Sequence, residues 1–271
     1  MMTTADIAQT EVTTRTVIDV RGLGHSYGGP QIFEGLDFTV GKGEFVCIVG
    51  PSGVGKSTLL QCLTGLIRPS DGEIVFEGRK VTEPPEGLAI VFQDYSRSLM
   101  PWLSVIDNVA LPLRSAGVKK AERRARAREA LVEVGLSDVG PAYPWQLSGG
   151  MQQRVAIARA LASKPRAIVM DEPFASVDAQ TRADLEDLVL RVREHLGLTV
   201  ILVTHDIDEA VYLADTVLAL SGRPARVAAM LPIDLPRPRD QLSTKALPAF
   251  ADFRAEVYTL IRKPTTQSEP E

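Results

Sequence analysis

The sequence is poor in the residues that build disulfides and transition-metal sites. Only two of its 271 residues are cysteine and three are histidine. Cys47 and Cys62 lie within apolar runs, and two cysteines make neither a disulfide framework nor a four-ligand metal site. The histidines, His25, His195 and His205, show no metal-ligand spacing. We therefore expect a protein of a reducing compartment and no transition-metal chemistry.

An excess of positive charge and a long apolar run are also missing. The 30 lysines and arginines face 34 acidic residues, a net charge of -4, so no overall basic field attracts nucleic acid. Nowhere do the roughly 18 apolar residues that cross a bilayer follow one another. Residues 1–16 are polar and threonine-rich, which predicts a flexible leader without an export signal. Any membrane association is then expected to depend on a partner.

The apolar residues that are present, 45% of the chain, are arranged as in an α/β protein. Continuous apolar runs at 45–49, 88–92, 167–170 and 199–203 are typical of parallel strands buried on both faces. Alternating residues at 17–27 and 31–40, separated by Gly28-Gly29-Pro30, predict an antiparallel hairpin. The fold class expected from these patterns is α/β, with a parallel-sheet core and an N-terminal antiparallel β subdomain.

The order of the segments predicts a single domain over 17–263. We expect antiparallel β and core at 17–94, an inserted α-helical subdomain at about 95–164, a core continuation at 165–230 and a C-terminal extension at 231–263, with a disordered tail at 264–271. Residues 250–261 are expected to form a helix that packs on the core or pairs across a dimer. Alanine and glutamate interleave a basic stretch at 119–128, which favours a solvated helix face over a nucleic-acid site.

The apolar run at 45–49 ends abruptly in the sequence GPSGVGKST. In a phosphate-binding loop, glycines let the backbone turn its N–H groups onto phosphate oxygens, and the following helix presents its positive end to the same anion. Lys56 adds a charge near the β and γ phosphates, and the Ser57 hydroxyl can ligate Mg²⁺. The motif therefore predicts a nucleotide site with Mg²⁺. Its expected binding residues are Gly50, Pro51, Ser52, Gly53, Val54, Gly55, Lys56, Ser57 and Thr58.

Polar side chains follow three further apolar runs, at the edge of the sheet where α/β sites assemble. Asp171 is suited to hold Mg²⁺ through water, and Glu172 to orient or activate a water for in-line attack. Their alternative role is an acidic helix cap before Pro173. His205 can donate to a γ-phosphate, and the amide oxygen of Gln93 can reach metal or water. The expected catalytic residues are Lys56, Gln93, Glu172 and His205, and the expected metal ligands are Ser57, Gln93 and Asp171.

Residues 147–154 read LSGGMQQR, a feature that phosphate-loop kinases and GTPases lack. This resembles the signature motif of ATP-binding cassette (ABC) ATPases. Tyr27 stands at the position of the family's A-loop aromatic, and Asp178 closes a D-loop-like sequence, ASVD. The resemblance covers nearly the whole chain and implies a RecA-like P-loop NTPase fold that binds ATP. It also implies that Tyr27 stacks on adenine, although an aromatic residue at a strand end can instead be a packing residue.

Ser148 can cap a helix that begins near Gly149, which leaves free N–H groups as a second anion site. The resemblance implies that two chains pair head to tail, so that Ser148, Gly149 and Gly150 of one cover the γ-phosphate held by the other. Asp178 would couple the two sites. Two positions depart from the usual motifs, Met151 in place of glutamine and Val177 in place of leucine, and neither replaces a group assigned to phosphate chemistry.

Met151 is familiar among cassettes of nitrate, sulfonate and taurine importers, which the chain also resembles at 99–105, 209–215 and 233–239. The resemblance implies an ATPase coupled to transmembrane transport, a homodimer peripheral to the cytoplasmic face of the cell membrane. Its implied partners are integral-membrane permease subunits and an extracytoplasmic solute-binding protein. The permease is expected to contact Arg97, Leu99, Met100 and Trp102, although Trp102 can alternatively pack inside the helical lobe.

Other functions use the same nucleotide motifs. A soluble cassette ATPase acting on nucleic acid or ribosomes is the main alternative, but the chain lacks a second cassette, a coiled-coil insertion and net positive charge. A phosphate-loop kinase leaves the signature and His205 unexplained. Exporter cassettes share the nucleotide motifs, so import of nitrate, sulfonate, taurine or a similar small solute rests on the narrower resemblance.

Overall fold

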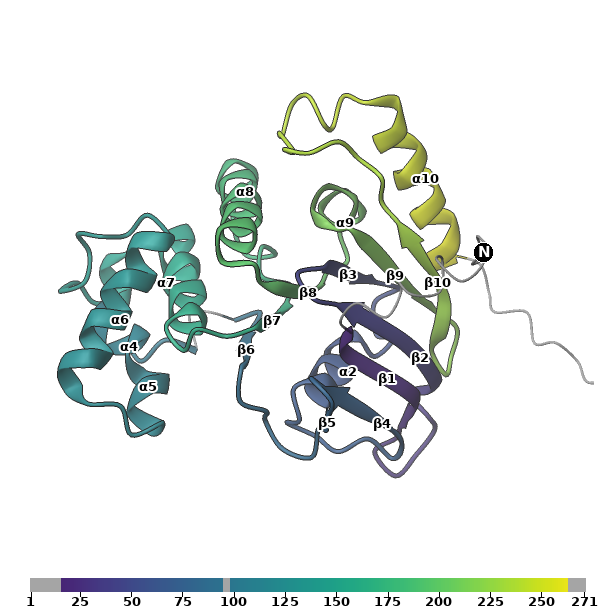
Figure 1. The fold of residues 1–271 in the computed structure, drawn as a ribbon. Coiled ribbons are helices and arrows are strands. Elements are labelled where there is room, and N and C mark those ends of the chain that lie inside the picture. The colour runs from purple at the N-terminus through teal and green to yellow at the C-terminus, as the bar shows by residue number, and fades with distance from the viewer. Residues whose placement is uncertain (1–15, 95–97, 263–271) are drawn as a thin grey trace, which may run out of the picture.

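The computed structural model describes residues 16–94 and 98–262, and within them the larger sheet has six strands (Figure 1). The strand order is β10-β9-β3-β8-β7-β6, with β10 antiparallel to β9 and the other neighbours parallel. Their bounds are β3 Phe45–Val49, β6 Leu88–Val91, β7 Ala167–Asp171, β8 Thr199–Val203, β9 Thr216–Ser221 and β10 Arg226–Pro232. The four apolar runs predicted to be parallel strands therefore lie side by side in one sheet.

A second sheet in the described part of the chain has four antiparallel strands in the order β2-β1-β4-β5. Their bounds are β1 Thr16–His25, β2 Phe33–Gly41, β4 Asp71–Phe76 and β5 Arg79–Lys80. The expected N-terminal hairpin is formed by β1 and β2, and Thr16, predicted to end the leader, begins β1. Residues 1–15 of the predicted leader lie outside the described residues.

The large sheet has an apolar layer on each face, because successive residues of a strand point to opposite sides. In β3, Val46 and Ile48 join the cluster that includes α2 (Lys56–Leu63) and the small sheet. Phe45, Cys47 and Val49 join the cluster on the other face, which contains α8 (Ala179–Leu196) and α9 (Ile207–Leu213). This arrangement explains why the core runs are continuously apolar.

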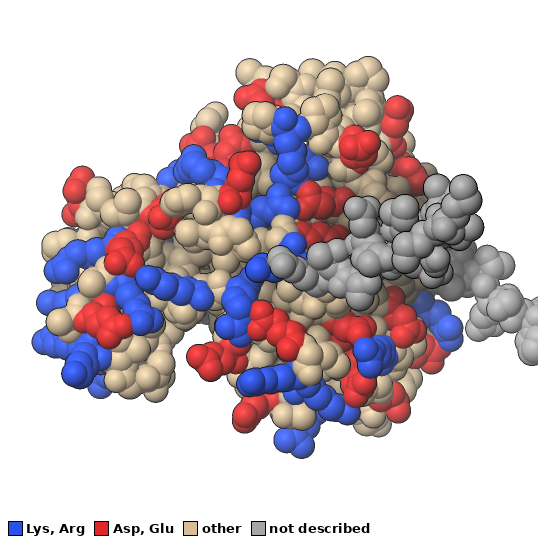
Figure 2. Space-filling model, viewed as in Figure 1, with Lys and Arg blue, Asp and Glu red and all other residues tan. Residues whose placement is uncertain are grey.

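A helical lobe lies beside the core sheet (Figure 1). It comprises α4 Val105–Val109, α5 Leu111–Ser115, α6 Lys120–Glu133, a 3₁₀ turn at Pro144–Gln146 and α7 Gly149–Leu161. Helix α6, which carries the basic stretch, buries only Ala127, Ala130 and Leu131. On the face shown in Figure 2, basic side chains of the lobe are interspersed with acidic and uncharged ones. The stretch is thus a solvated helix face, as its composition predicted.

The C-terminal part of the chain returns to the core. Strand β10 continues to Pro232, past the predicted start of the extension at 231, and α10 Pro248–Arg262 packs against α9, β9 and β10. Helix α10 buries Phe250 and Val257, so of the two expected arrangements it packs on its own core. The predicted tail at 264–271 lies outside the described residues. Among the described helices, none is long and apolar enough to cross a membrane.

Candidate functional site

The predicted catalytic residues follow strands that are neighbours in the sheet. The order β3-β8-β7-β6 places the phosphate loop, His205, Glu172 and Gln93 along one edge. Glu172 lies at the centre of the group: its Oε2 is 3.0 Å from Nδ1 of His205 and accepts a hydrogen bond of 3.1 Å from Nε2 of Gln93. The edge therefore holds a carboxylate between an imidazole and an amide, beside an anion-binding loop.

The phosphate loop between β3 and α2 has close contacts that only glycine permits. Gly55 has φ +100°, and a Cβ there would lie 2.4 Å from Cγ2 of Ile32. A Cβ on Gly50 would lie 2.8 Å from the carbonyl oxygen of Leu220. The glycine spacing of GPSGVGKST thus has a steric reason in this fold, and the loop can turn its backbone N–H groups toward an anion.

Lys56 begins α2 and is 7% exposed. Its Nζ donates to the carbonyl oxygens of Gly50 at 2.9 Å and Pro51 at 3.2 Å. Burial lowers the pKa of Lys56, whereas the nearby carboxylates of Glu172 and Asp171 raise it. The ammonium is thus held inside the loop, close to both carboxylates of the site.

Ser57 and Asp171 offer oxygen atoms of the kind that Mg²⁺ prefers. Oγ of Ser57 donates to Oδ1 of Asp171 at 3.3 Å, so the two oxygen atoms are already adjacent. Burial raises the pKa of Asp171, and the hydrogen bond from Ser57 lowers it. The described residues contain no group of three or more His, Cys, Asp or Glu side chains that could hold a metal ion. The pair therefore fits a hard cation that takes its remaining ligands from phosphate and water.

Glu172 has φ +42°, a left-handed conformation that is uncommon outside glycine. Its N–H donates to the carbonyl oxygen of Val203 at 2.8 Å, which fixes the backbone against β8. No helix begins at Pro173 in the described structure: Asp178 is the N-cap of the next helix, α8. The helix-cap alternative for Asp171 and Glu172 is therefore wrong.

Tyr27 follows β1 and is 66% exposed, so it is not a packing residue of the core. Its ring meets the buried ring of His25 at 88°, with the centroids 4.7 Å apart. The edge-to-face contact leaves much of the tyrosine ring open to solvent and available for stacking. Trp102, for which packing inside the lobe was an alternative, is 71% exposed, so that alternative is wrong. Arg97 lies outside the described residues, and Leu99 is 1% exposed and packs in the core, so its expected contact with a permease is wrong.

The signature residues lie in the helical lobe. Oγ of Ser148 accepts from the N–H of Met151 at 3.4 Å and caps α7, as expected. A Cβ on Gly150 would lie 2.3 Å from Cγ2 of Thr181 on α8, so this glycine also serves packing that the sequence did not indicate. Asp178 accepts from N and Oγ1 of Thr181, at 3.0 and 2.7 Å. These hydrogen bonds lower the pKa of Asp178.

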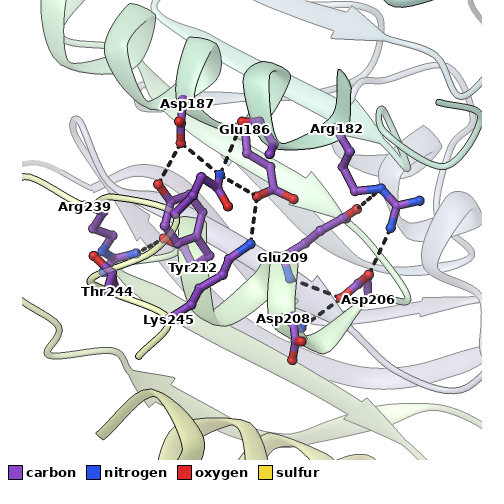
Figure 3. Close-up of polar contacts among 12 residues, drawn as sticks. Arg182, Glu186, Asp187, Asp206, Asp208, Glu209, Tyr212, Arg239, Thr244 and Lys245 are labelled. Carbon is purple, nitrogen blue, oxygen red and sulfur yellow. Dashed lines mark hydrogen bonds and ion pairs between the residues drawn. The ribbon is translucent and has the colours of Figure 1, made fainter. Parts of the chain in front are cut away.

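The structure does not bring every predicted nucleotide-binding residue together. No hydrogen bond among the described residues joins 148–150 to 50–58, and Figure 1 shows α7 in the lobe while α2 lies under the core sheet. The chain thus carries two separate candidate anion sites. Sequence analysis also missed a polar cluster at the turn after β8, in which buried Glu209 pairs with partly buried Arg182 (Figure 3). Nothing in the spacing of these residues distinguishes them from an ordinary helix face.

Comparison with known proteins places the chain in a family. A family profile described as ABC transporter matches residues 33–175. The taurine import ATP-binding protein TauB of Rhizobium johnstonii is 45% identical over 230 residues, 83% of this chain and 87% of that protein. The nitrate import ATP-binding protein NrtC of Synechococcus elongatus is 42% identical over 240 residues, 87% of this chain and 36% of that protein.

Solved structures agree with this placement. A dimeric, post-hydrolysis structure of the ATP-binding cassette MJ0796, bound to ADP and Pi, matches with a TM-score of 0.70 at 32% identity, over 80% of this chain and 98% of that one. The predicted α/β cassette fold, with its parallel core, antiparallel subdomain and helical insertion, is confirmed. The chain belongs to the ABC transporter family and is one of its ATP-binding cassettes.

Proposed function

We propose that this chain hydrolyses ATP to power an ABC importer. The observation that carries the proposal is the position of Glu172, within hydrogen-bond distance of both Gln93 and His205 and beside the phosphate loop. A carboxylate oriented in this way is suited to accept the proton of an attacking water, with no covalent intermediate.

Each residue of the site has a proposed role. Tyr27 stacks on the adenine, and residues 50–58 bind the phosphates, with Lys56 near the β and γ groups. His205 donates to the γ-phosphate, and Gln93, whose Nε2 already donates to Glu172, presents its amide oxygen to metal or water. Mg²⁺ held by Ser57, Gln93 and Asp171 would neutralise charge on the β and γ phosphates.

The proposed working unit is a head-to-tail homodimer. The N-terminus of α7, capped by Ser148, lies in the lobe without a hydrogen bond to the chain's own phosphate loop among the described residues. A partner chain therefore offers the simplest way to place Ser148, Gly149 and Gly150 over a nucleotide. The dimeric structure reported for MJ0796, at 32% identity, supports this arrangement. Asp178, near Gly150 through Thr181, would then couple the two sites.

A groove between the core and the lobe is the proposed contact for a permease. It has a volume of about 840 Å³ and is lined by both apolar and polar residues, including Phe92, Ser98, Leu111 and Arg159. Trp102 lies in the same part of the chain, and its exposed ring adds apolar surface that a partner could cover. Such a contact would hold the protein at the cytoplasmic face of the membrane.

The proposed cargo is nitrate, a sulfonate, taurine or a similar small solute, delivered by an extracytoplasmic binding protein. The names of the nitrate and taurine import relatives support this class. They favour an importer over a soluble cassette acting on nucleic acid or ribosomes. The interspersed charges on the face in Figure 2 and the net charge of -4 also disfavour a nucleic-acid partner.

The test is a pull-down of tagged Glu172→Gln protein from detergent-solubilised native membranes with ATP and Mg²⁺. We expect a multi-span permease to copurify, and its companion binding protein can then be screened for the solute. Lys56→Ala, which should bind ATP more weakly, is the matched control and should retain less permease. Recovery of ribosomes or DNA without a membrane protein would overturn the importer proposal.

A further inference from the structure

A buried carboxylate lies behind His205 and has no part in the ATP chemistry proposed above. Glu209 is 5% exposed and lies in the first turn of α9, four residues after His205. Burial of a carboxylate is costly unless hydrogen bonds or opposite charges compensate. The contacts of Glu209 therefore indicate which part of the structure this buried carboxylate stabilises.

The first contact is with the residue that precedes His205. Oγ1 of Thr204 donates to Oε2 of Glu209 at 2.7 Å and accepts from the N–H of Asp206 at 2.9 Å. One hydroxyl thus connects the residues on both sides of His205, and the carboxylate fixes the orientation of that hydroxyl. The N–H of Thr204 also donates to the carbonyl oxygen of Ile48 in β3, at 3.2 Å.

The second contact connects the same turn to α8. Arg182 lies 3.3 Å from Oδ2 of Asp206 and 3.7 Å from Oε1 of Glu209, and Figure 3 shows its guanidinium between the two carboxylates. Oδ1 of Asp206 caps α9 by accepting from the N–H groups of Asp208 and Glu209, at 2.9 and 3.2 Å. The backbone around His205 is thus held from β3, α8 and α9 together.

The contact with Thr204 needs an oxygen acceptor, whereas burial and the nearby carboxylates oppose a negative charge on Glu209. Burial raises the pKa of Glu209 to about 7, with Asp206 and Glu186 also raising it, while Thr204 and Arg182 lower it. Two further groups lie on neighbouring elements. Burial and the charge of Glu209 raise the pKa of the Cys47 thiol in β3. Nζ of Lys245 lies 3.3 Å from Oε2 of Glu186. A neutral acceptor of the same shape can therefore replace the carboxylate without leaving a buried charge unpaired.

We propose that Glu209 is a positioning residue, which fixes the turn between β8 and α9 so that His205 meets Glu172 and the γ-phosphate. This inference rests on the proposed role of His205 in ATP hydrolysis. Among the described residues, Glu209 makes no hydrogen bond or ion pair with the phosphate loop or with Glu172, so its effect passes through Thr204 and the backbone of residues 204–206.

The test measures steady-state ATPase activity of the full chain with Glu209→Ala and Glu209→Gln, each with and without His205→Ala. Misplacing His205 should lower kcat by about tenfold in Glu209→Ala, with KM for ATP within about twofold, because the phosphate loop is untouched. Glu209→Gln keeps an oxygen that accepts from Thr204 and should restore most of kcat. In the His205→Ala background, Glu209→Ala should cause no further loss.

Thr204→Val is a second variant, because it removes the hydroxyl without removing a buried charge, and it should reproduce the loss of kcat if Glu209→Ala does not fold. Glu186→Gln is the matched control: Glu186 is 2% exposed and contacts Gln241 and Lys245 but not the turn. It should keep parental kcat even if its melting temperature falls.

The outcomes separate the two proposals. If His205→Ala alone retains parental kcat, the proposed role of His205 fails, and the positioning role of Glu209 fails with it. If His205→Ala is impaired but Glu209→Ala is as active as the parent, or lowers kcat equally in both backgrounds, only the positioning role is overturned. A rise in KM at constant kcat would likewise contradict it.

Discussion

Glu172 has a backbone conformation that non-glycine residues seldom adopt, at the point where the site is most constrained. A left-handed φ of +42° costs on the order of 1–3 kcal/mol and persists only where neighbouring structure compensates. Here the N–H of Glu172 bonds to Val203, and its carboxylate meets Gln93 and His205. The strain therefore fits a side chain whose direction is fixed for function.

Two substitutions separate nucleotide binding from hydrolysis. Glu172→Gln should keep ATP affinity and trap a dimer, while turnover falls by ~10² fold or more, the scale of a missing general base. Lys56→Ala should instead weaken ATP binding, because a charge held within the phosphate loop is lost. Fluorescent-nucleotide titration and single-turnover hydrolysis measure the two effects. Parental turnover in Glu172→Gln would show that its assigned role is wrong.

The buried carboxylate of Glu209 should make stability depend on pH. Its pKa is raised from 4.5 to about 7, so the folded protein binds the proton more tightly than the unfolded chain. This contribution is fully present below pH 4.5 and is lost as the pH rises through about 7. Glu209→Gln does not titrate, so its stability relative to the parent should improve from pH 5 to pH 8, by at most roughly 3 kcal/mol. Urea unfolding at both pH values measures this, and an unchanged difference would contradict the buried titration.

At the scale of elements, the core could be predicted because its parallel strands are continuously apolar and are followed by the phosphate loop or by polar residues. Continuous apolar runs indicated β3, β6, β7 and β8, and their polar successors indicated the edge where the site lies. The contact between Gly150 and Thr181, and that between Thr204 and Glu209, join elements or turns whose relative orientation no periodicity specifies. The exposure of Trp102 is likewise set by lobe packing, which a single apolar residue does not reveal.

The contact between α7 and α8 gives a prediction about packing. In Gly150→Ala, the new Cβ would meet Cγ2 of Thr181, whose Oγ1 is held by Asp178 and so resists rotation. Overpacking of this kind costs about 1–3 kcal/mol, which outweighs the helix propensity gained from alanine. Thr181→Ser removes the methyl group and keeps the hydroxyl, so it should recover the stability lost in Gly150→Ala. Chemical unfolding of the parent, both single variants and the double variant measures the coupling, and additive effects would refute the steric account.

At the scale of the whole molecule, one of the two candidate anion sites lies in the core and the other lies in the helical lobe. The phosphate loop belongs to the core and the Ser148-capped helix to the lobe (Figure 1). A contact between Gly150 and Thr181 of α8, whose N-cap is Asp178, connects the lobe to the core. A nucleotide bound between two chains would contact the core of one chain and the lobe of the other. Binding energy could therefore move each lobe relative to its core.

This division leads to a complementation experiment. Ser148→Arg should leave ATP binding by the monomer nearly intact but block closure, and Lys56→Ala should lose its own nucleotide, so each homodimer should be inactive. In a mixed head-to-tail dimer, the phosphate loop of the Ser148→Arg chain faces the unmodified signature of the Lys56→Ala chain, and one complete site forms. Mixing the two inactive proteins should therefore restore measurable ATPase activity, whereas mixing the Ser148→Arg protein with the double variant Lys56→Ala/Ser148→Arg should not, because every signature in that mixture carries arginine. If mixing restores nothing, or if Ser148→Arg abolishes ATP binding by the monomer, the signature does not act on the partner's nucleotide.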